Sequence, residues 1–364
     1  MEIPVQFRFL ISGFDTIECA YWLMQKPGLS DTPFDFTVLG VEKEILRASK
    51  SKRPTWIRLG TEEFLLASHG TGSGYAFLLE NDVFSVQCGE FNKPNFFVAF
   101  RSFALWHIGA QALHQRFLTW AGSVGMVPYR PEKLSRVDLT FDYQIPEIDF
   151  DEDSFISMAD KDAQHRKDGR VQTFRFGSGD LVLRVYNKCD EIEEKSAKSW
   201  FYTLWGVESG VWRIEWQTRK EILKRFGIRT LEDLAERQGD LLRYLVNDHT
   251  TLRISGGDSN RSRWPLHSLW IDLQQRIEAM EGLGVVRECD PQTMLDERLI
   301  RLGTSVYGYM KRLAAIYCLK SSNNKIGLEE AMEKLSKLLN RIHDPLNWDG
   351  DVQRRIDEMR LGQR

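Results

Sequence analysis

The sequence predicts an α+β fold: a largely antiparallel sheet in two strand-rich halves with packed helices, followed by a helical C-terminal extension. Three observations support this prediction. Residues 136–142, 181–188 and 211–219 alternate apolar and polar side chains, as a strand with two different faces does. The turn Gly177-Ser-Gly-Asp180 joins two such runs, which indicates a hairpin and therefore antiparallel pairing. Beyond residue 265, apolar residues recur at helical spacing.

The N-terminal half, residues 1–128, consists mainly of short segments with strand-like alternation. A longer helix is predicted at 103–122, where Leu105, Leu113 and Phe117 recur on one face and Ala-Gly-Ser-Val-Gly ends the pattern. This half therefore supplies strands and one long helix to cover them. The other predicted elements are a short helix at 38–48 and strands at 5–11, 16–23, 55–59, 63–68, 75–79, 83–88 and 95–101.

The second half, residues 129–255, has a similar order of parts without residue-level similarity to the first. A polar loop at 256–264 follows it. Residues 265–364 are predicted to form a helical subdomain, with helices at 266–280, 291–319 and 327–341, and we expect it to contact a partner or DNA. Within the second half the predicted strands are 135–143, 171–176, 181–188, 211–218 and 252–255, and the predicted helices are 153–158, 190–204, 220–226 and 231–247.

The composition predicts a sizeable core and no membrane span. Of 364 residues, 42% are hydrophobic and 28% are charged, and no stretch has the roughly 18 apolar residues that a spanning helix needs. The N-terminus lacks the basic and apolar pattern of a secretory signal. The five cysteines are scattered and form no CxxC pair, which argues against structural zinc and favours reduced thiols. We therefore expect a cytoplasmic protein that does not bind membranes.

The three alternating segments each place their polar residues on one face. Trp212 and Trp216 fall on the opposite, apolar face, so we expect them in the core. If the strands share a sheet, the polar face gathers carboxylates, a tyrosine and cations, a set that suits metal-assisted phosphodiester chemistry. The net charge of −3 argues against a general nucleic-acid coat but is compatible with local basic faces.

The order of these segments resembles the replication initiation factor family. Its members are trans-acting initiators of small rolling-circle plasmids, with similar phage proteins and relaxases of integrative conjugative elements. The resemblance rests on Arg-Val-Asp-Leu-Thr-Phe-Asp at 136–142, Gly-Ser-Gly at 177–179, Leu-Arg-Val-Tyr-Asn-Lys at 183–188 and Trp-Arg-Ile-Glu-Trp at 212–216. It implies an enzyme that nicks one DNA strand and becomes covalently joined to the 5′ end through a tyrosine.

The resemblance assigns the nucleophile to Tyr186. A phenol has a pKa of about 10, so at neutral pH it is protonated and must be activated before it can act as a nucleophile. Arg184 and Lys188 lie two residues away on the same strand face, where cations would favour the phenolate and bind the scissile phosphate. Tyr202, on the predicted helix that follows, is the alternative nucleophile. A structural tyrosine with a satisfied hydroxyl is the other interpretation of Tyr186.

The resemblance maps two metal ligands onto Asp138 and Glu215, and Asp142 is a secondary candidate. Asp138 and Asp142 would lie about 13 Å apart at about 3.3 Å per residue, too far for one ion unless the strand bends. The sequence lacks the paired histidines of other rolling-circle nickases, since His107 and His114 lie seven positions apart on a predicted helix. Oxygen ligands favour Mg²⁺ or Mn²⁺.

Ordinary cross-strand salt bridges are the alternative role for the same acids. They would join Asp138 to Arg213, and Glu215 to Arg184 or Arg136. The strand arginines are equally candidates for phosphate contacts, because the guanidinium fork fits two phosphate oxygens. The predicted DNA-contacting residues are Arg136, Arg213 and Arg219 on the strands, and Arg261 and Arg263 in the basic loop that ends at Trp264.

The implied function is a metal-dependent rolling-circle initiator that nicks one strand at an origin. A conjugative relaxase would use the same chemistry. Two other interpretations are a sequence-specific DNA-binding initiator that does not cut, and a hydrolytic nuclease that leaves a free 5′ phosphate. The expected partner is DNA, both as the double-stranded origin and as the single-stranded nick site, and a helicase and a second copy of the chain are further candidates.

Overall fold

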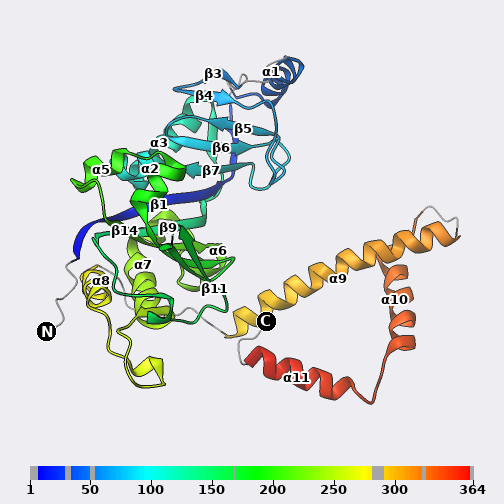
Figure 1. Ribbon diagram of the computed structural model, residues 1–364. Coiled ribbons are helices and arrows are strands. Elements are labelled where there is room, and N and C mark those ends of the chain that lie inside the picture. Colours follow the sequence, from blue (N-terminus) through cyan, green and yellow to red (C-terminus); the bar gives the residue numbers. More distant parts are fainter. Residues whose placement is uncertain are drawn as a thin grey trace. The chain divides into compact units, whose positions relative to one another are not determined.

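The computed structural model describes residues 7–28, 34–49, 54–167, 169–280, 291–321 and 325–360 (Figure 1). The chain divides into two compact units, Met1–Glu288 and Cys289–Arg364. The sequence places the start of the helical subdomain at residue 265, earlier than the structure does. The difference arises because α8 (Ser268–Glu278) buries Trp270 and Leu273 in the core of the first unit.

An eleven-stranded sheet forms the centre of the first unit, and each pair of neighbouring strands is antiparallel. The predicted fold class is therefore confirmed. The two strand-rich halves share this one sheet, because β1 and β9 pair along its middle. In sheet order the strands are β11 (Asp162–Lys167), β12 (Arg170–Phe176), β13 (Leu181–Asn187), β14 (Val211–Arg219), β9 (Lys133–Gln144), β1 (Arg8–Tyr21), β7 (Phe96–Phe100), β6 (Phe84–Cys88), β5 (Phe77–Glu80), β4 (Glu62–Leu66) and β3 (Thr55–Leu59).

β1 is one strand of 14 residues, whereas the sequence predicts separate strands at 5–11 and 16–23. Residues 5 and 6 lie outside the described part of the chain. The register of β1 against β9 shifts at three places, one of them between Phe14 and Thr16. A bulge lets a strand absorb an extra residue and continue to pair, so the polar residue Asp15 does not end the strand.

One hydrophobic core joins the apolar face of the sheet to α3 (Ala110–Ser123), α7 (Leu231–Tyr244) and α8. Trp216 is fully buried, and its ring centroid lies 6.0 Å from that of Trp270 on α8. Trp212 is also in this core. The structure therefore confirms that both tryptophans of β14 belong to the core.

Shorter helices lie against the polar face of the sheet. Residues of α2 (Ser102–Ile108), α4 (Lys188–Glu191) and α5 (Trp200–Trp205) form a second, smaller apolar cluster that includes Trp106, Phe201 and Trp205. A Cβ atom on Gly13 of β1 would lie 2.9 Å from the Trp106 ring. The absence of a side chain at Gly13 therefore lets α2 approach the sheet closely.

Two long predicted helices are interrupted. The helix predicted at 103–122 is divided into α2 and α3 at Gly109, whose φ of 89° lies in the left-handed region. The helix predicted at 190–204 becomes α4, a π-helical turn at Ile192–Ser196, and α5. Ala197, with a φ of 52°, ends the π-helical turn. The second break lies at the candidate site, because residues of α4 and of the π-helical turn line it.

The prediction of a helix at 153–158 is wrong. Glu152–Ser154 form a 3₁₀ turn, and the Asp151 side chain accepts a hydrogen bond from the Ser154 backbone there. The next residues form the short strand β10 (Phe155–Ser157). The sequence also did not predict β11. The remaining elements of the first unit are α1 (Phe36–Ala48), β2 (Leu23–Gln25), β8 (Met126–Pro128), α6 (Lys220–Arg225), a π-helical turn at Leu245–His249, β15 (Thr250–Leu252) and a 3₁₀ turn at Arg261–Arg263.

The second unit consists of α9 (Pro291–Ser321), α10 (Leu328–Ile342) and α11 (Trp348–Arg360). Helices at 291–319 and 327–341 were predicted, and α11 was not. In the described ranges of the chain, no helix combines the length and apolar character that crossing a bilayer requires.

Candidate active site

Two rows of polar residues cross the sheet from β12 to β9. Each row takes one residue from β12, β13, β14 and β9, and the rows are two residues apart along each strand. Because alternate residues of a strand share a face, both rows lie on the same face. The first row is Arg175, Arg184, Glu215 and Thr140, and the second row is Thr173, Tyr186, Arg213 and Asp142.

Tyr186 and Arg184 both bind the carboxylate of Glu215. The Tyr186 hydroxyl donates to Oε2 of Glu215 at 2.8 Å, and Nη2 of Arg184 donates to Oε1 at 2.5 Å. Burial, followed by the Glu215 charge, raises the pKa of the Tyr186 phenol well above its usual value. In the free protein the phenol is therefore protonated and already bonded to a proton acceptor. The sequence had instead suggested that neighbouring cations hold it as a phenolate.

Tyr186 is 9% exposed, and it lines a pocket of about 340 Å³. Arg175 and Arg184 come to this pocket from the sheet, and Asp190 and Glu194 come from α4 and the π-helical turn. The pocket is therefore basic on the sheet side and acidic on the helix side. The complete lining is His165, Gln172, Thr173, Arg175, Arg184, Tyr186, Asn187, Asp190, Glu191, Glu194 and Lys195.

Lys188 lies beneath this surface. It is 2% exposed, its ammonium donates to Glu191 at 2.5 Å, and it lies 5.6 Å from the centre of the Tyr186 ring. Burial, followed by the charge of Arg213, lowers the pKa of Lys188. Lys188 therefore contacts the face of the tyrosine ring and ties β13 to α4.

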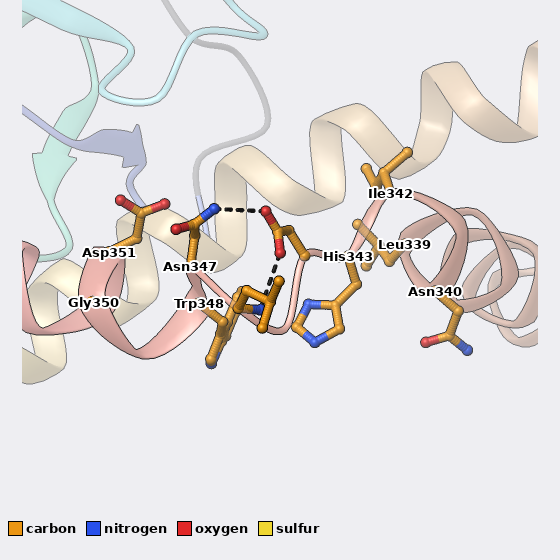
Figure 2. A pocket seen from close by; sticks show the side chains of 10 residues that line it. Leu339, Asn340, Ile342, His343, Asn347, Trp348, Gly350 and Asp351 are labelled. Carbon is orange, nitrogen blue, oxygen red and sulfur yellow. Dashed lines mark hydrogen bonds between the residues drawn. The ribbon is translucent and has the colours of Figure 1, made fainter.

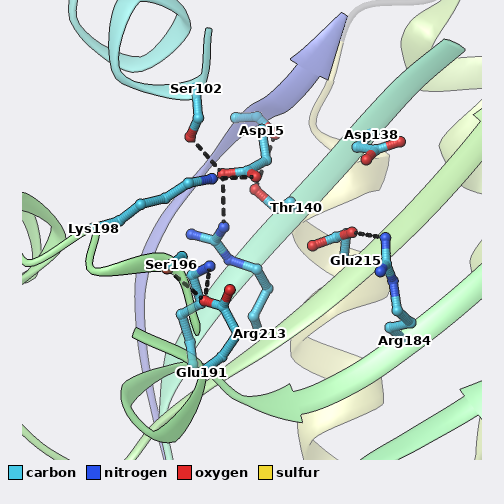
Figure 3. Close-up of polar contacts among 12 residues, drawn as sticks. Asp15, Ser102, Asp138, Thr140, Arg184, Glu191, Ser196, Lys198, Arg213 and Glu215 are labelled. Atoms are coloured by element: carbon cyan, nitrogen blue, oxygen red, sulfur yellow. Dashed lines mark hydrogen bonds and ion pairs between the residues drawn. The ribbon is translucent and has the colours of Figure 1, made fainter. Parts of the chain in front are cut away.

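Asp138 is diagonal to Glu215 across β9 and β14, since Thr140 is the direct partner of Glu215. Arg136 holds Asp138 with two hydrogen bonds, at 2.9 and 2.5 Å. Burial raises the pKa of Asp138 to about 6, and the Glu215 charge adds to the rise while Arg136 opposes it. The two acids are therefore close enough to repel each other (Figure 3).

Asp138 and Glu215 are carboxylates, the class of ligand that Mg²⁺ and Mn²⁺ prefer. Such ions are held in phosphate chemistry by one or two carboxylates together with substrate oxygens. A carboxylate has about four lone-pair sites, and the contacts named above use two on each acid. Within the described residues, no group of three or more His, Cys, Asp and Glu side chains is arranged to hold a metal ion. The ion would therefore depend on substrate or water for its other ligands.

Asp142 belongs to a different, buried network. Arg213 is fully buried and donates to Asp142 from Nε at 2.6 Å and from Nη2 at 2.7 Å, and the indole of Trp205 donates to Asp142 at 2.8 Å. Arg213 also reaches Asp15 at 3.0 Å (Figure 3). The structure therefore places Asp142 with Arg213 and away from the Asp138 and Glu215 pair, and the guanidinium of Arg213 is occupied by protein carboxylates.

Sequence reasoning missed Asp15 and its two further partners. Lys198 donates to Asp15 at 3.0 Å and Ser102 donates to it at 2.8 Å. Burial opposes ionisation of Asp15, but Arg213 and Lys198 outweigh it and hold its pKa well below the usual range. Asp15 is the extra residue of the β1 bulge, and bulges re-aim side chains in this way. No signal in the sequence distinguishes this aspartate from a surface one.

The other predicted arginines lie apart from the Tyr186 pocket. Arg136 and Arg219 are direct partners at the end of β9 and β14. Arg261 donates to the backbone carbonyl of Phe155, the first residue of β10, at 2.9 Å. The Arg263 side chain is 73% exposed, 3.7 Å from Asp258. Arg261 and Arg263 thus remain candidates for DNA contact on a different surface.

Tyr202, the alternative nucleophile, lies on α5 and does not line the Tyr186 pocket. Its ring lies edge-on to Trp205 at 5.8 Å. Burial, followed by the charge of Cys189, raises its pKa. Of the two candidate tyrosines, Tyr186 lines the pocket and Tyr202 does not.

A larger hollow, of about 830 Å³, lies in the second unit between the end of α10 and α11 (Figure 2). The Asn347 amide donates to Asp344 there at 2.8 Å, and the rings of His343 and Trp348 lie 5.3 Å apart. Its described lining contains neither an arginine nor a tyrosine. This larger hollow therefore lacks the arginines and the tyrosine that line the Tyr186 pocket.

Comparison with known proteins gives few matches. No protein-family model matches the sequence, and no curated protein matches it. Among solved structures the chain is similar to the rolling circle replication initiator protein from Geobacillus stearothermophilus. The two are 17% identical, the match covers 75% of this chain and 98% of that chain, and the TM-score is 0.43.

Proposed function

We propose that this protein nicks and rejoins DNA, with Tyr186 as the nucleophile. The observation that carries the proposal is the hydrogen bond from the Tyr186 hydroxyl to the buried Glu215 carboxylate in an arginine-lined pocket. A phenol that attacks phosphorus needs a proton acceptor within hydrogen-bond reach and a cation beside the phosphate. Glu215 supplies the acceptor, and Arg184 supplies the cation.

In the proposed step the Tyr186 oxygen bonds to phosphorus as its proton passes to Oε2 of Glu215. The bond from phosphorus to the 3′ oxygen breaks, and that oxygen takes a proton from solvent and leaves as a 3′ hydroxyl. The 5′ phosphate remains on the tyrosine as a diester. Attack by a 3′ hydroxyl reverses the step and rejoins the strand without ATP. A hydrolytic nuclease would instead release a free 5′ phosphate.

The buried groups around Tyr186 position it for this step. Lys188 contacts the tyrosine ring, and Arg213, the direct strand partner of Tyr186, is fixed by Asp142 and Asp15. A side chain held by packing and by a second layer of hydrogen bonds keeps its geometry when substrate binds. We therefore assign Lys188 and Arg213 to positioning of the nucleophile.

We further propose that Asp138 and Glu215 hold Mg²⁺ or Mn²⁺ when substrate is present. When bound there, the ion would polarise a non-bridging oxygen of the scissile phosphate. The support is the mutual repulsion of the two carboxylates, which a cation would relieve. Asp142 is left out of this role because it is fully buried and accepts three hydrogen bonds, two from Arg213 and one from Trp205.

The biological context that we propose is initiation of rolling-circle replication, on the resemblance of the strand segments alone. A conjugative relaxase uses the same chemistry and is the second candidate. In either context the single-stranded nick site would enter the Tyr186 pocket. The surface around Arg261 and Arg263 would contact the duplex origin, since it lies outside the reacting rows.

The test is a covalent adduct between the protein and a labelled single-stranded oligonucleotide, measured on a denaturing gel with divalent metal. Oligonucleotides from the DNA that neighbours the gene are the first substrates to use. The wild type should form the adduct, and Tyr186→Phe should form none while its DNA affinity stays nearly intact, because only the reacting oxygen is removed. Tyr202→Phe is the matched control and should form the adduct normally. If Tyr186→Phe still forms the adduct, Tyr186 is not the nucleophile. If only Tyr202→Phe loses the adduct, Tyr202 is the nucleophile instead.

A further inference from the structure

The two arginines of the pocket face each other across neighbouring strands. Arg175 of β12 and Arg184 of β13 are direct partners, and both line the pocket beside Tyr186. Like charges in directly opposite positions destabilise a sheet unless something compensates them. Arg184 is compensated by Glu215.

Arg175 differs from Arg184 in its surroundings. Its side chain is exposed, and no residue in the described ranges forms a hydrogen bond or ion pair with it. Sequence reasoning did not select Arg175, because it lies outside the three alternating segments. An uncompensated guanidinium opposite a second one, at the edge of a pocket, suits an anionic ligand.

We propose that Arg175 and Arg184 form a phosphate subsite that binds the backbone of the nicked strand next to Tyr186. This inference rests on the proposed nicking function and names the residue that seats its substrate. The guanidinium fork matches two oxygens of a phosphodiester. Thr173, the direct strand partner of Tyr186, also lines the pocket and offers a hydroxyl donor.

The charges of the pocket set where a phosphate would bind. Asp190 and Glu194 repel an anion from the helix side, whereas the sheet side carries Arg175 and Arg184. A phosphate is therefore directed toward the sheet side, which Tyr186 also lines.

The experiment measures binding without cleavage, in full-length protein carrying Tyr186→Phe. A fluorescent thymidine oligonucleotide is titrated at several salt concentrations, and the logarithm of affinity is plotted against the logarithm of salt. Loss of one phosphate contact to a single strand lowers the slope by about 0.7. Arg175→Ala should weaken binding and lower the slope by about that amount. Arg175→Lys keeps the charge and should restore most of the slope but not the full affinity.

Arg170→Ala is the matched control. Arg170 is exposed on the same strand, and it does not line the pocket. Its removal should leave the slope and the affinity unchanged. An unchanged slope with Arg175→Ala, or an equal fall with both variants, would overturn the proposed subsite. This assay measures binding and requires no adduct. A protein that binds DNA as expected but does not nick it would contradict the role of Tyr186 and would leave the phosphate subsite supported.

Discussion

Each acidic side chain on the polar face of the sheet has its role set by the cation beside it. Asp142 is neutralised by the fully buried Arg213, so it stabilises the fold. Glu215 binds both Arg184 and the Tyr186 hydroxyl, so its carboxylate lies within hydrogen-bond reach of the phenol proton. Asp138 is paired with Arg136 but also lies near Glu215, whose charge adds to the rise in the Asp138 pKa that burial causes.

Replacement of Asp138 and of Asp142 should therefore have different effects. Asp138→Asn should lower nicking and raise the Mg²⁺ or Mn²⁺ concentration needed for half-activity, because one hard ligand is lost. Asp142→Asn should leave that concentration unchanged and lower the free energy of unfolding by up to about 3–5 kcal/mol, since the buried Arg213 then keeps only its weaker carboxylate partner, Asp15. The metal titration and the melting curve of each variant check this. Full wild-type activity in excess chelator would remove the metal proposal.

Asp15 should contribute to stability in a pH-dependent way. Its pKa is lowered in the folded protein, so its contribution is fully present above the ordinary value of 3.8 and is lost as the pH falls below that value. Asp15→Asn should thus melt well below the wild type at pH 7, and the difference should shrink progressively below pH 3.8. A difference in melting midpoint that stays constant over this range would show that the charge of Asp15 does not stabilise the fold.

The sequence could predict which face each of these residues occupies, because alternation alone determines it. It could not choose partners within that face. The expected salt bridge from Glu215 to Arg184 is present, whereas Asp138 pairs with Arg136 instead of Arg213. The difference comes from strand register, because Asp142 is the direct partner of Arg213 whereas Asp138 lies opposite Gln217.

At the scale of elements, the site depends on how closely helices approach the polar face. α2 packs on β1 through the contact of Trp106 with Gly13, and Ser102 of the same helix donates to Asp15. α5 brings Trp205 to Asp142. These helices therefore hold the buried network that positions Arg213.

A methyl group at Gly13 should disturb this packing. Gly13→Ala would place Cβ 2.9 Å from the Trp106 ring, and such overpacking destabilises by about 1–3 kcal/mol. Gly40→Ala is the matched control, because Gly40 lies inside α1 with no atom within 4 Å of a new Cβ. That change should instead stabilise by about 0.5–1 kcal/mol, since alanine favours a helix. The melting midpoints of both variants are compared with that of the wild type. If Gly13→Ala leaves the midpoint unchanged, α2 can shift to accommodate the new methyl group.

The strands were easier to predict than the helices for a physical reason. A strand with one apolar and one polar face alternates in polarity at every second residue, and β9, β13 and β14 do so even though both faces of β9 and β14 are largely buried. The helix breaks occur at single residues, Gly109 and Ala197, that have a positive φ, and the helical spacing of apolar residues does not mark them. β11 was missed because its residues are mostly exposed and polar, so no alternation marks it.

At the scale of the whole molecule, the residues proposed for catalysis all belong to the first unit. Tyr186, Arg184, Glu215 and Asp138 lie on three adjacent strands of a sheet that has its own hydrophobic core. The sequence assigned residues 265–280 to the helical extension because they are helical. Helical periodicity does not report which core a helix packs against, and α8 packs against the sheet.

A chain that ends at Glu288 should therefore retain the chemistry. It keeps the sheet, both polar rows and α8, so we expect it to melt cooperatively and to form the Tyr186 adduct with a single-stranded oligonucleotide as efficiently as the full chain. Duplex origin binding is the property that can depend on α9, α10 and α11. The adduct yield, the melting curve and duplex affinity of both chains are compared. If the shorter chain melts normally but forms no adduct on single-stranded DNA, the helical unit takes part in the reaction, and the site is larger than the strands that we describe.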